Sequence, residues 1–110
     1  MIDMEEFSKS MEFNHTGMQL LLGDYLTHFK CPVSHIQTLC EKEDYYELMT
    51  YANQLRLTLM LLNDSKTPLG LARLEHLAKY EFYPPEDLIN DISVDLDVIE
   101  QQILQLTQRQ

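Results

Sequence analysis

The spacing of apolar residues predicts helices along almost the whole chain. In residues 16–30 they recur at three- and four-residue steps, which is typical of a helix with one buried stripe. This stripe comprises Met18, Leu21, Leu22, Tyr25, Leu26 and Phe29. A clearer stripe after Asp44 predicts the best-defined core helix, and it comprises Tyr45, Leu48, Ala52, Leu55, Leu59 and Leu62. No alternation of apolar and polar residues indicates a strand.

Capping residues mark where two of these helices begin. Asp3 predicts the start of a short helix that runs through Ser10, with acidic residues in its first turn, where the helix dipole favours negative charge. Asp44 is followed three residues later by Glu47, which is the spacing of a capping box.

Prolines divide the rest of the chain into helical segments. Pro32 suits the first position of a helix whose inner face carries Val33, Ile36, Leu39 and Cys40. Pro68 suits the start of the next helix, after the polar run 63–66, and residues 83–85 form a stiff connector before a last helix over about 86–108. Short loops between such helices predict one domain, residues 1–110, folded as an all-α antiparallel four-helix bundle with a short N-terminal helix.

The composition narrows the classes of partner. Eighteen acidic against eight basic residues among 110 give a net charge of −10, which disfavours nucleic acids and anionic membranes. The start of the chain has no basic and apolar leader pattern, and no apolar run approaches the roughly 20 residues that span a bilayer. We therefore expect a cytoplasmic protein in which Cys31 and Cys40 are reduced thiols.

One ordered set of residues carries a resemblance to a known family. A helix ending in Leu26 and Phe29 precedes a helix with Ile36 and Leu39, and the residues that follow are Asp44, Leu48, Ala52, Leu55 and Arg56. This order resembles the histidine-containing phosphotransfer (HPt) domain of bacterial phosphorelays, whose motif is Ala-His-x-Leu-Lys-Gly. The likeness extends over nearly the whole chain and implies an HPt-like bundle.

The chain departs from that motif at the residue that carries the phosphoryl group. It reads Ala-Asn-Gln-Leu-Arg-Leu from Ala52, so Asn53 stands where the family has its phosphorylated His. The family uses a partly neutral imidazole nitrogen as nucleophile. An amide nitrogen has its lone pair delocalised and is no substitute, although it still forms hydrogen bonds. Leu57 replaces the family Gly, with Met60 and Leu61 on the adjoining surface.

The resemblance and these departures together imply a binding module, not an enzyme, with no cofactor and no metal. It would dock the receiver domain of a response regulator, or a hybrid histidine kinase, without passing phosphate. The expected contact residues are Asn53, Arg56, Leu57 and Met60. Two alternatives stay open: phosphotransfer through another His, with His76 as the candidate, and a self-associating homodimeric adaptor unrelated to phosphorelays.

Two further groups of residues have a functional interpretation and a plainer one. His28, Cys31, His35 and Cys40 loosely match zinc-ligand spacing, but Pro32 breaks the helix between them, so we favour a structural role. Acidic residues without neighbouring Lys or Arg crowd the last helix and its approach: Glu81, Glu86, Asp87, Asp91, Asp95, Asp97 and Glu100. We favour a solvated face over electrostatic steering toward a basic partner.

Overall fold

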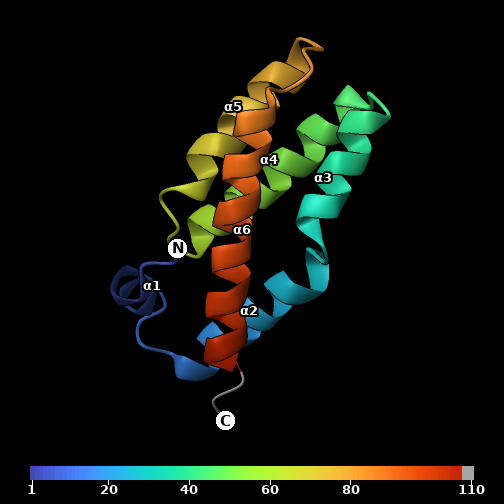
Figure 1. The fold of residues 1–110 in the computed structure, drawn as a ribbon. Coiled ribbons are helices and arrows are strands. Elements are labelled where there is room, and N and C mark those ends of the chain that lie inside the picture. The colour runs from blue at the N-terminus through green and yellow to red at the C-terminus, as the bar shows by residue number, and fades with distance from the viewer. Residues whose placement is uncertain (108–110) are drawn as a thin grey trace.

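The computed structural model describes residues 1–107, and this part of the chain is helical with no strand. Its six helices are α1 (Met4–Ser10), α2 (His15–His28), α3 (Pro32–Glu41), α4 (Tyr45–Leu61), α5 (Thr67–Lys79) and α6 (Glu86–Thr107) (Figure 1). The all-α class predicted from the sequence is confirmed. The predicted end of the last helix, Gln108, lies outside the described residues.

The two helix starts predicted from Asp3 and Asp44 are confirmed by side-chain caps. The Asp3 carboxylate accepts a hydrogen bond from the backbone N–H of Glu6 at 3.1 Å, and Asp44 accepts one from the N–H of Glu47 at 3.3 Å. Each cap pairs one of the N–H groups that a helix start otherwise leaves free. Helices α3 and α5 begin with proline in their first turn, as the sequence predicts.

Helix α2 differs from its predicted range of 16–30 at both ends. Its cap is Asn14, whose side-chain oxygen accepts from the N–H of Gly17 at 3.0 Å, so the helix begins at His15. It ends at His28 because Phe29 has left helical backbone angles and Cys31 has a positive φ of 48°. The residue before a proline is disfavoured in helical geometry, and here Pro32 already starts the next helix.

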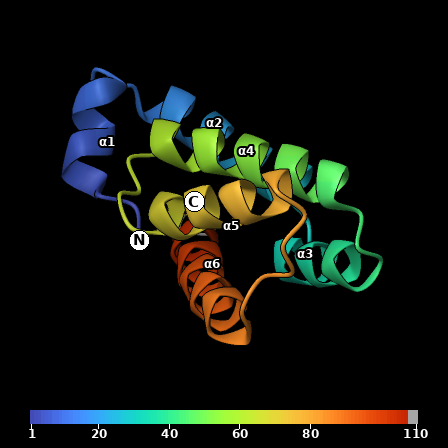
Figure 2. The same cartoon turned by 90° about the horizontal axis from the view of Figure 1, so that it is seen from above.

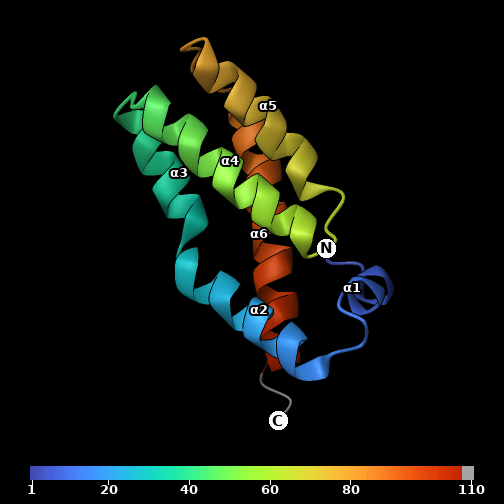
Figure 3. The same cartoon turned by 180° about the vertical axis from the view of Figure 1, so that it is seen from behind.

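The helices form an elongated molecule with extents of 41 × 21 × 21 Å. Helices α4 and α5 lie side by side, and α3 flanks α4 on its other side (Figure 3). Helix α6 contacts α5 and α3 and, farther along its length, α2. Helix α1 lies at the edge of the molecule, beside the loop that joins α4 to α5 (Figure 2).

The core follows the stripes predicted from the sequence. Along α4 and its end, the side chains of Leu48, Ala52, Leu55, Leu59 and Leu62 are fully buried, while Tyr45 is half-buried. In α2, Met18, Leu22 and Tyr25 are buried, and Leu21, Leu26 and Phe29 pack against the core at its margin. Among residues 1–107, no helix has both the length and the apolar character needed to cross a membrane.

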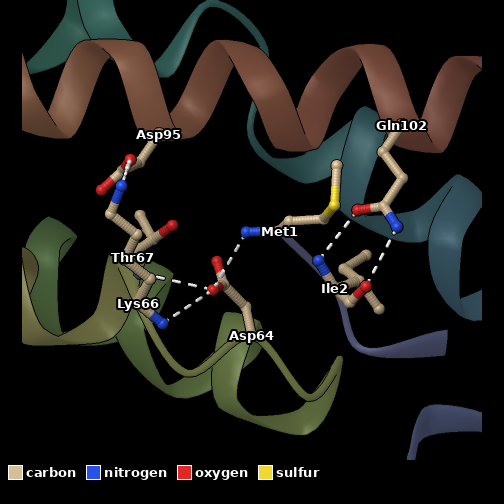
Figure 4. Close-up of polar contacts among 7 residues, drawn as sticks. All are labelled: Met1, Ile2, Asp64, Lys66, Thr67, Asp95 and Gln102. Carbon is tan, nitrogen blue, oxygen red and sulfur yellow. Dashed lines mark hydrogen bonds and ion pairs between the residues drawn. The ribbon is translucent and has the colours of Figure 1, made fainter. Parts of the chain in front are cut away.

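The N-terminal segment is tied to distant parts of the chain, as Figure 4 shows. Ile2 is buried; its N–H donates to the Gln102 side-chain oxygen at 2.8 Å, and its carbonyl accepts from the Gln102 Nε2 at 3.0 Å. The N–H of Asp3 donates to the carbonyl of Asn63 at 3.0 Å. These bonds connect the approach to α1 with α6 and with the α4–α5 loop.

Candidate functional site

Helix α4 places the four predicted contact residues beside its buried stripe. Asn53 and Arg56 each follow a buried residue by one position, and they are three residues apart, so their side chains leave the same side of the helix. Leu57 and Met60 continue the strip toward the C-terminal end of α4. The structure therefore brings Asn53, Arg56, Leu57 and Met60 together on one surface.

The polar part of this surface is organised by Glu75 of α5. The Asn53 Nδ2 donates to the Glu75 Oε1 at 2.8 Å, and the Arg56 Nη2 donates to the same oxygen at 3.4 Å. The Arg56 Nε donates to the other carboxylate oxygen, Oε2. Only 24% of the Arg56 side chain and 16% of the Glu75 side chain are exposed. A partly buried, two-pronged ion pair of this kind fixes both side chains.

Glu75 is the site residue that sequence reasoning missed. It lies 22 residues from Asn53 and 19 from Arg56, and the sequence shows it only as one polar residue in a helix. Placing α4 and α5 side by side would predict that Glu75 lies near α4. It would not predict the rotation of α5 that turns Glu75 toward Asn53. Its carboxylate balances the charge of Arg56, a residue that the sequence predicts as a contact for a partner.

The apolar part of the surface is open to solvent. Leu57 is 48% exposed and Met60 is 52% exposed, so neither side chain is covered by a neighbouring helix. Leu61 is exposed as well. The Met60 sulfur lies 3.7 Å from the Arg56 Nη1, which joins the apolar and polar parts. Together, Asn53, Arg56, Leu57, Met60 and Glu75 form what we call the Asn53 surface.

Of the other histidines, His76 lies next to the Asn53 surface, where it lines a shallow hollow together with Arg56 and Glu75. His76 is exposed in the last turn of α5, with its ring 5.1 Å from that of Tyr80. The His35 ring lies 4.4 Å from the Tyr51 ring, and Cys40 is buried. Within residues 1–107, no group of three or more His, Cys, Asp or Glu side chains could hold a metal ion.

The acidic residues of the last helix are mostly solvated. Asp87, Asp91 and Asp97 are exposed. Asp95, which is half-buried, pairs with Lys66 at 3.2 Å between the carboxylate oxygen and Nζ.

The Asn53 surface combines an amide, a neutralised guanidinium and open apolar side chains. These groups can bind and orient a partner, but an amide is not an activated nucleophile. Comparison of the chain with protein-family models, with curated proteins and with solved structures finds no match. The chemistry of the surface is therefore the basis for a functional interpretation.

Proposed function

We propose that the chain is a non-catalytic, HPt-like binding module that docks a receiver domain of a response regulator or of a hybrid histidine kinase. The observation that supports this proposal is the surroundings of Asn53, which aligns with the family's phosphorylated His. The Asn53 side chain is hydrogen-bonded to Glu75 and lies beside exposed Leu57 and Met60. The surface can contact a partner through its apolar side chains, and it carries an amide instead of an imidazole at position 53.

An HPt-like four-helix antiparallel bundle is the finer fold that goes with this function. Helices α3, α4, α5 and α6 support it, since each contacts the next and α6 also contacts α3. Such a closed set of neighbours is what a four-helix bundle requires. On this interpretation, the Asn53 surface lies on the outside of the bundle, where a receiver domain can reach it.

The charges around Asn53 also argue against phosphoryl transfer at this position. The Glu75 Oε1 lies 2.8 Å from the Asn53 amide nitrogen. A phosphoryl group arriving there would meet a carboxylate at close range, in a partly buried setting where like charges repel strongly. Docking without transfer fits this arrangement, because binding needs the apolar surface and no covalent step.

Titration with purified receiver domains of the same organism tests the proposal. We expect at least one of them to bind, and Leu57→Asp to weaken the affinity at least about tenfold because it places a charge in an apolar contact. The matched control is Leu20→Asp, a change at an exposed leucine of α2, which should bind as the wild type does. If no receiver domain binds, or if both variants lose affinity equally, the proposal is wrong.

A self-associating adaptor is a second candidate, favoured by the exposed run of Leu57, Met60 and Leu61 on α4. Exposed apolar patches of this kind often mark interfaces. Light scattering of the wild type and of Leu57→Asp separates this case. A dimer that the substitution dissociates would support self-association, and a monomer in both would remove it.

A further inference from the structure

An open groove lies where α1, the C-terminal part of α4 and the first turns of α5 meet. Its volume is about 520 Å³, and its lining includes Met60 of α4 with Leu69 and Ala72 of α5. Its other side is lined by Asp3 and Glu6, from the start of α1. Arg56 and Met60 border both this groove and the Asn53 surface, but the groove extends away from Asn53 toward the N-terminal helix.

The floor of the groove is apolar and open. Leu69 is 69% exposed even though it lies in the first turns of α5, and Met60 is half exposed. Leu57 and Leu61, one helical turn apart on α4, add exposed apolar surface next to Met60. Large apolar side chains gathered around a concave surface indicate a place that another molecule covers.

The rim of the groove is acidic. Asp3 and Glu6 of the α1 side line it, and Glu6 pairs with Lys9 of its own helix at 3.6 Å, on the exposed surface. Lys9 also pairs with Glu5, so the three carboxylates of Asp3, Glu5 and Glu6 face one ammonium group and the α1 side stays negative. The charge of Arg56, the basic residue at the groove, is balanced by Glu75. The groove therefore presents an apolar floor beneath a negatively charged edge.

We propose that this groove binds an amphipathic helix of a partner protein that carries an apolar side chain between Lys or Arg residues. The apolar side chain would contact Met60 and Leu69, and the basic residues would face Asp3 and Glu6. The groove shares Arg56 and Met60 with the Asn53 surface, but its other contacts, Leu69, Asp3 and Glu6, have no part in the receiver-domain proposal.

A helix is the occupant that fits a groove built by helices. The part of the chain that the structure describes offers no strand edge to which an extended peptide could add, so recognition must come from side chains. A second copy of this chain is disfavoured, since each copy carries a net charge of −10 and would bring acidic residues to an acidic rim. Basic residues on the partner complement that rim.

Fluorescence anisotropy with a synthetic peptide tests the site. The probe is a labelled amphipathic peptide of about 18 residues, long enough to form a helix, with leucines on one face and lysines on the other. The control peptide keeps the leucines and replaces the lysines by glutamates. We expect micromolar binding of the basic peptide, weaker binding as salt is raised, and at least about tenfold weaker binding of the acidic peptide.

Paired variants separate a defined site from general attraction to an acidic protein. Leu69→Asp should weaken binding of the basic peptide at least about tenfold, whereas Leu20→Asp, at a similarly exposed leucine of α2, should not. Glu6→Gln should weaken it about threefold, and Glu41→Gln on α3, which removes the same charge elsewhere, should not.

Three results would overturn the proposal: no binding, equal effects of the paired variants, or a wild-type dimer that Leu69→Asp dissociates. Receiver-domain binding that is lost in Leu57→Asp and kept in Leu69→Asp would leave the two sites distinct. Failure of the peptide to bind therefore refutes the groove without bearing on the receiver-domain proposal.

Discussion

At the scale of single residues, Glu75 determines what the Asn53 surface can do. One carboxylate accepts hydrogen bonds from the Asn53 amide and from the Arg56 guanidinium, which fixes two side chains of α4 against α5. A half-buried guanidinium without its counter-charge would be costly, so this contact also stabilises the helix pair. The charge of Arg56 is therefore balanced within the molecule, and the exposed part of the Asn53 surface is mainly apolar.

We expect Asn53→His alone to leave phosphotransfer at background. The Glu75 carboxylate, 2.8 Å from the present amide nitrogen, would favour the protonated imidazole, whose nitrogen lone pair is occupied. Leu57 would still stand four residues farther along, where the family has Gly. Acid-labile radiolabel taken up from a phosphorylated receiver domain measures the outcome.

A combined variant is the control for that experiment. Asn53→His with Glu75→Gln and Leu57→Gly removes both the neighbouring charge and the bulk, so it should label more strongly than the single variant. Strong labelling of the single variant would contradict the role given to Glu75 and Leu57. Labelling of the wild type would point to another His, such as His76.

At the scale of elements, the sequence predicts where helices begin better than how they contact each other. Asp3 and Asp44 cap the helices that follow them because their short carboxylates reach N–H groups only a few residues away. The buried stripe of α4 is predicted for the same local reason, since its period matches the helix. Such interactions depend on neighbouring residues alone.

Contacts between residues far apart in the chain cannot be predicted from the local sequence pattern. Nothing in the pattern around Glu75 indicates that it contacts Asn53, because helix rotation depends on how whole faces pack. The start of α2 also differs from the predicted residue 16, because Asn14 caps a helix that begins at His15. Finally, Ile2 and Gln102 are 100 residues apart, and no local signal connects them.

The contact between the N-terminal segment and α6 leads to a prediction about Gln102. The Gln102 amide accepts a hydrogen bond from the Ile2 N–H and donates one to the Ile2 carbonyl. Gln102→Ala therefore leaves both backbone groups of Ile2 without their partner. We expect the free energy of unfolding to fall by about 1–3 kcal/mol. Urea denaturation measures it, and faster amide exchange at Ile2 and Asp3 should accompany it.

Gln101→Ala is the matched control for this change. Gln101 is the neighbouring residue on α6 and its side chain is exposed, so its removal should leave stability within about 0.5 kcal/mol of the wild type. Because Ala favours a helix at least as strongly as Gln, helix propensity cannot explain a loss, and equal losses in both variants would mean that the contact with Ile2 is not its cause.

At the scale of the whole molecule, the excess of negative charge is only partly balanced by ion pairs. Lys9 pairs with Glu5 and Glu6 on α1, and Lys66 pairs with Asp95, while the net charge remains −10. Self-repulsion of this kind opposes the compact state and favours partners that are basic. It also makes the fold sensitive to any further loss of protons.

We therefore expect the fold to lose stability at alkaline pH. Burial raises the pKa of Tyr51 from 10.0 to about 12, with a smaller contribution from nearby Cys31, and burial also raises the pKa of Tyr25. Tyrosines of the unfolded chain release their protons near pH 10, whereas the buried ones in the folded protein keep theirs to higher pH. The stability that comes from these protonated, buried tyrosines is therefore fully present below about pH 10 and is lost as the pH rises toward about 12. Denaturant titrations from about pH 8 to about pH 11 measure the loss.

Tyr51→Phe should make the decline shallower, because one proton is no longer released on unfolding. Tyr46→Phe provides the comparison, since Tyr46 is 71% exposed and its replacement should leave the wild-type pH dependence unchanged. Absorbance of the tyrosinate form gives an independent readout: the part of the folded protein's titration that Tyr51→Phe removes should lie at about pH 12, above the ordinary range of tyrosine. If the part that Tyr51→Phe removes lies at about pH 10 instead, Tyr51 is not shielded from water and the stability argument for it fails.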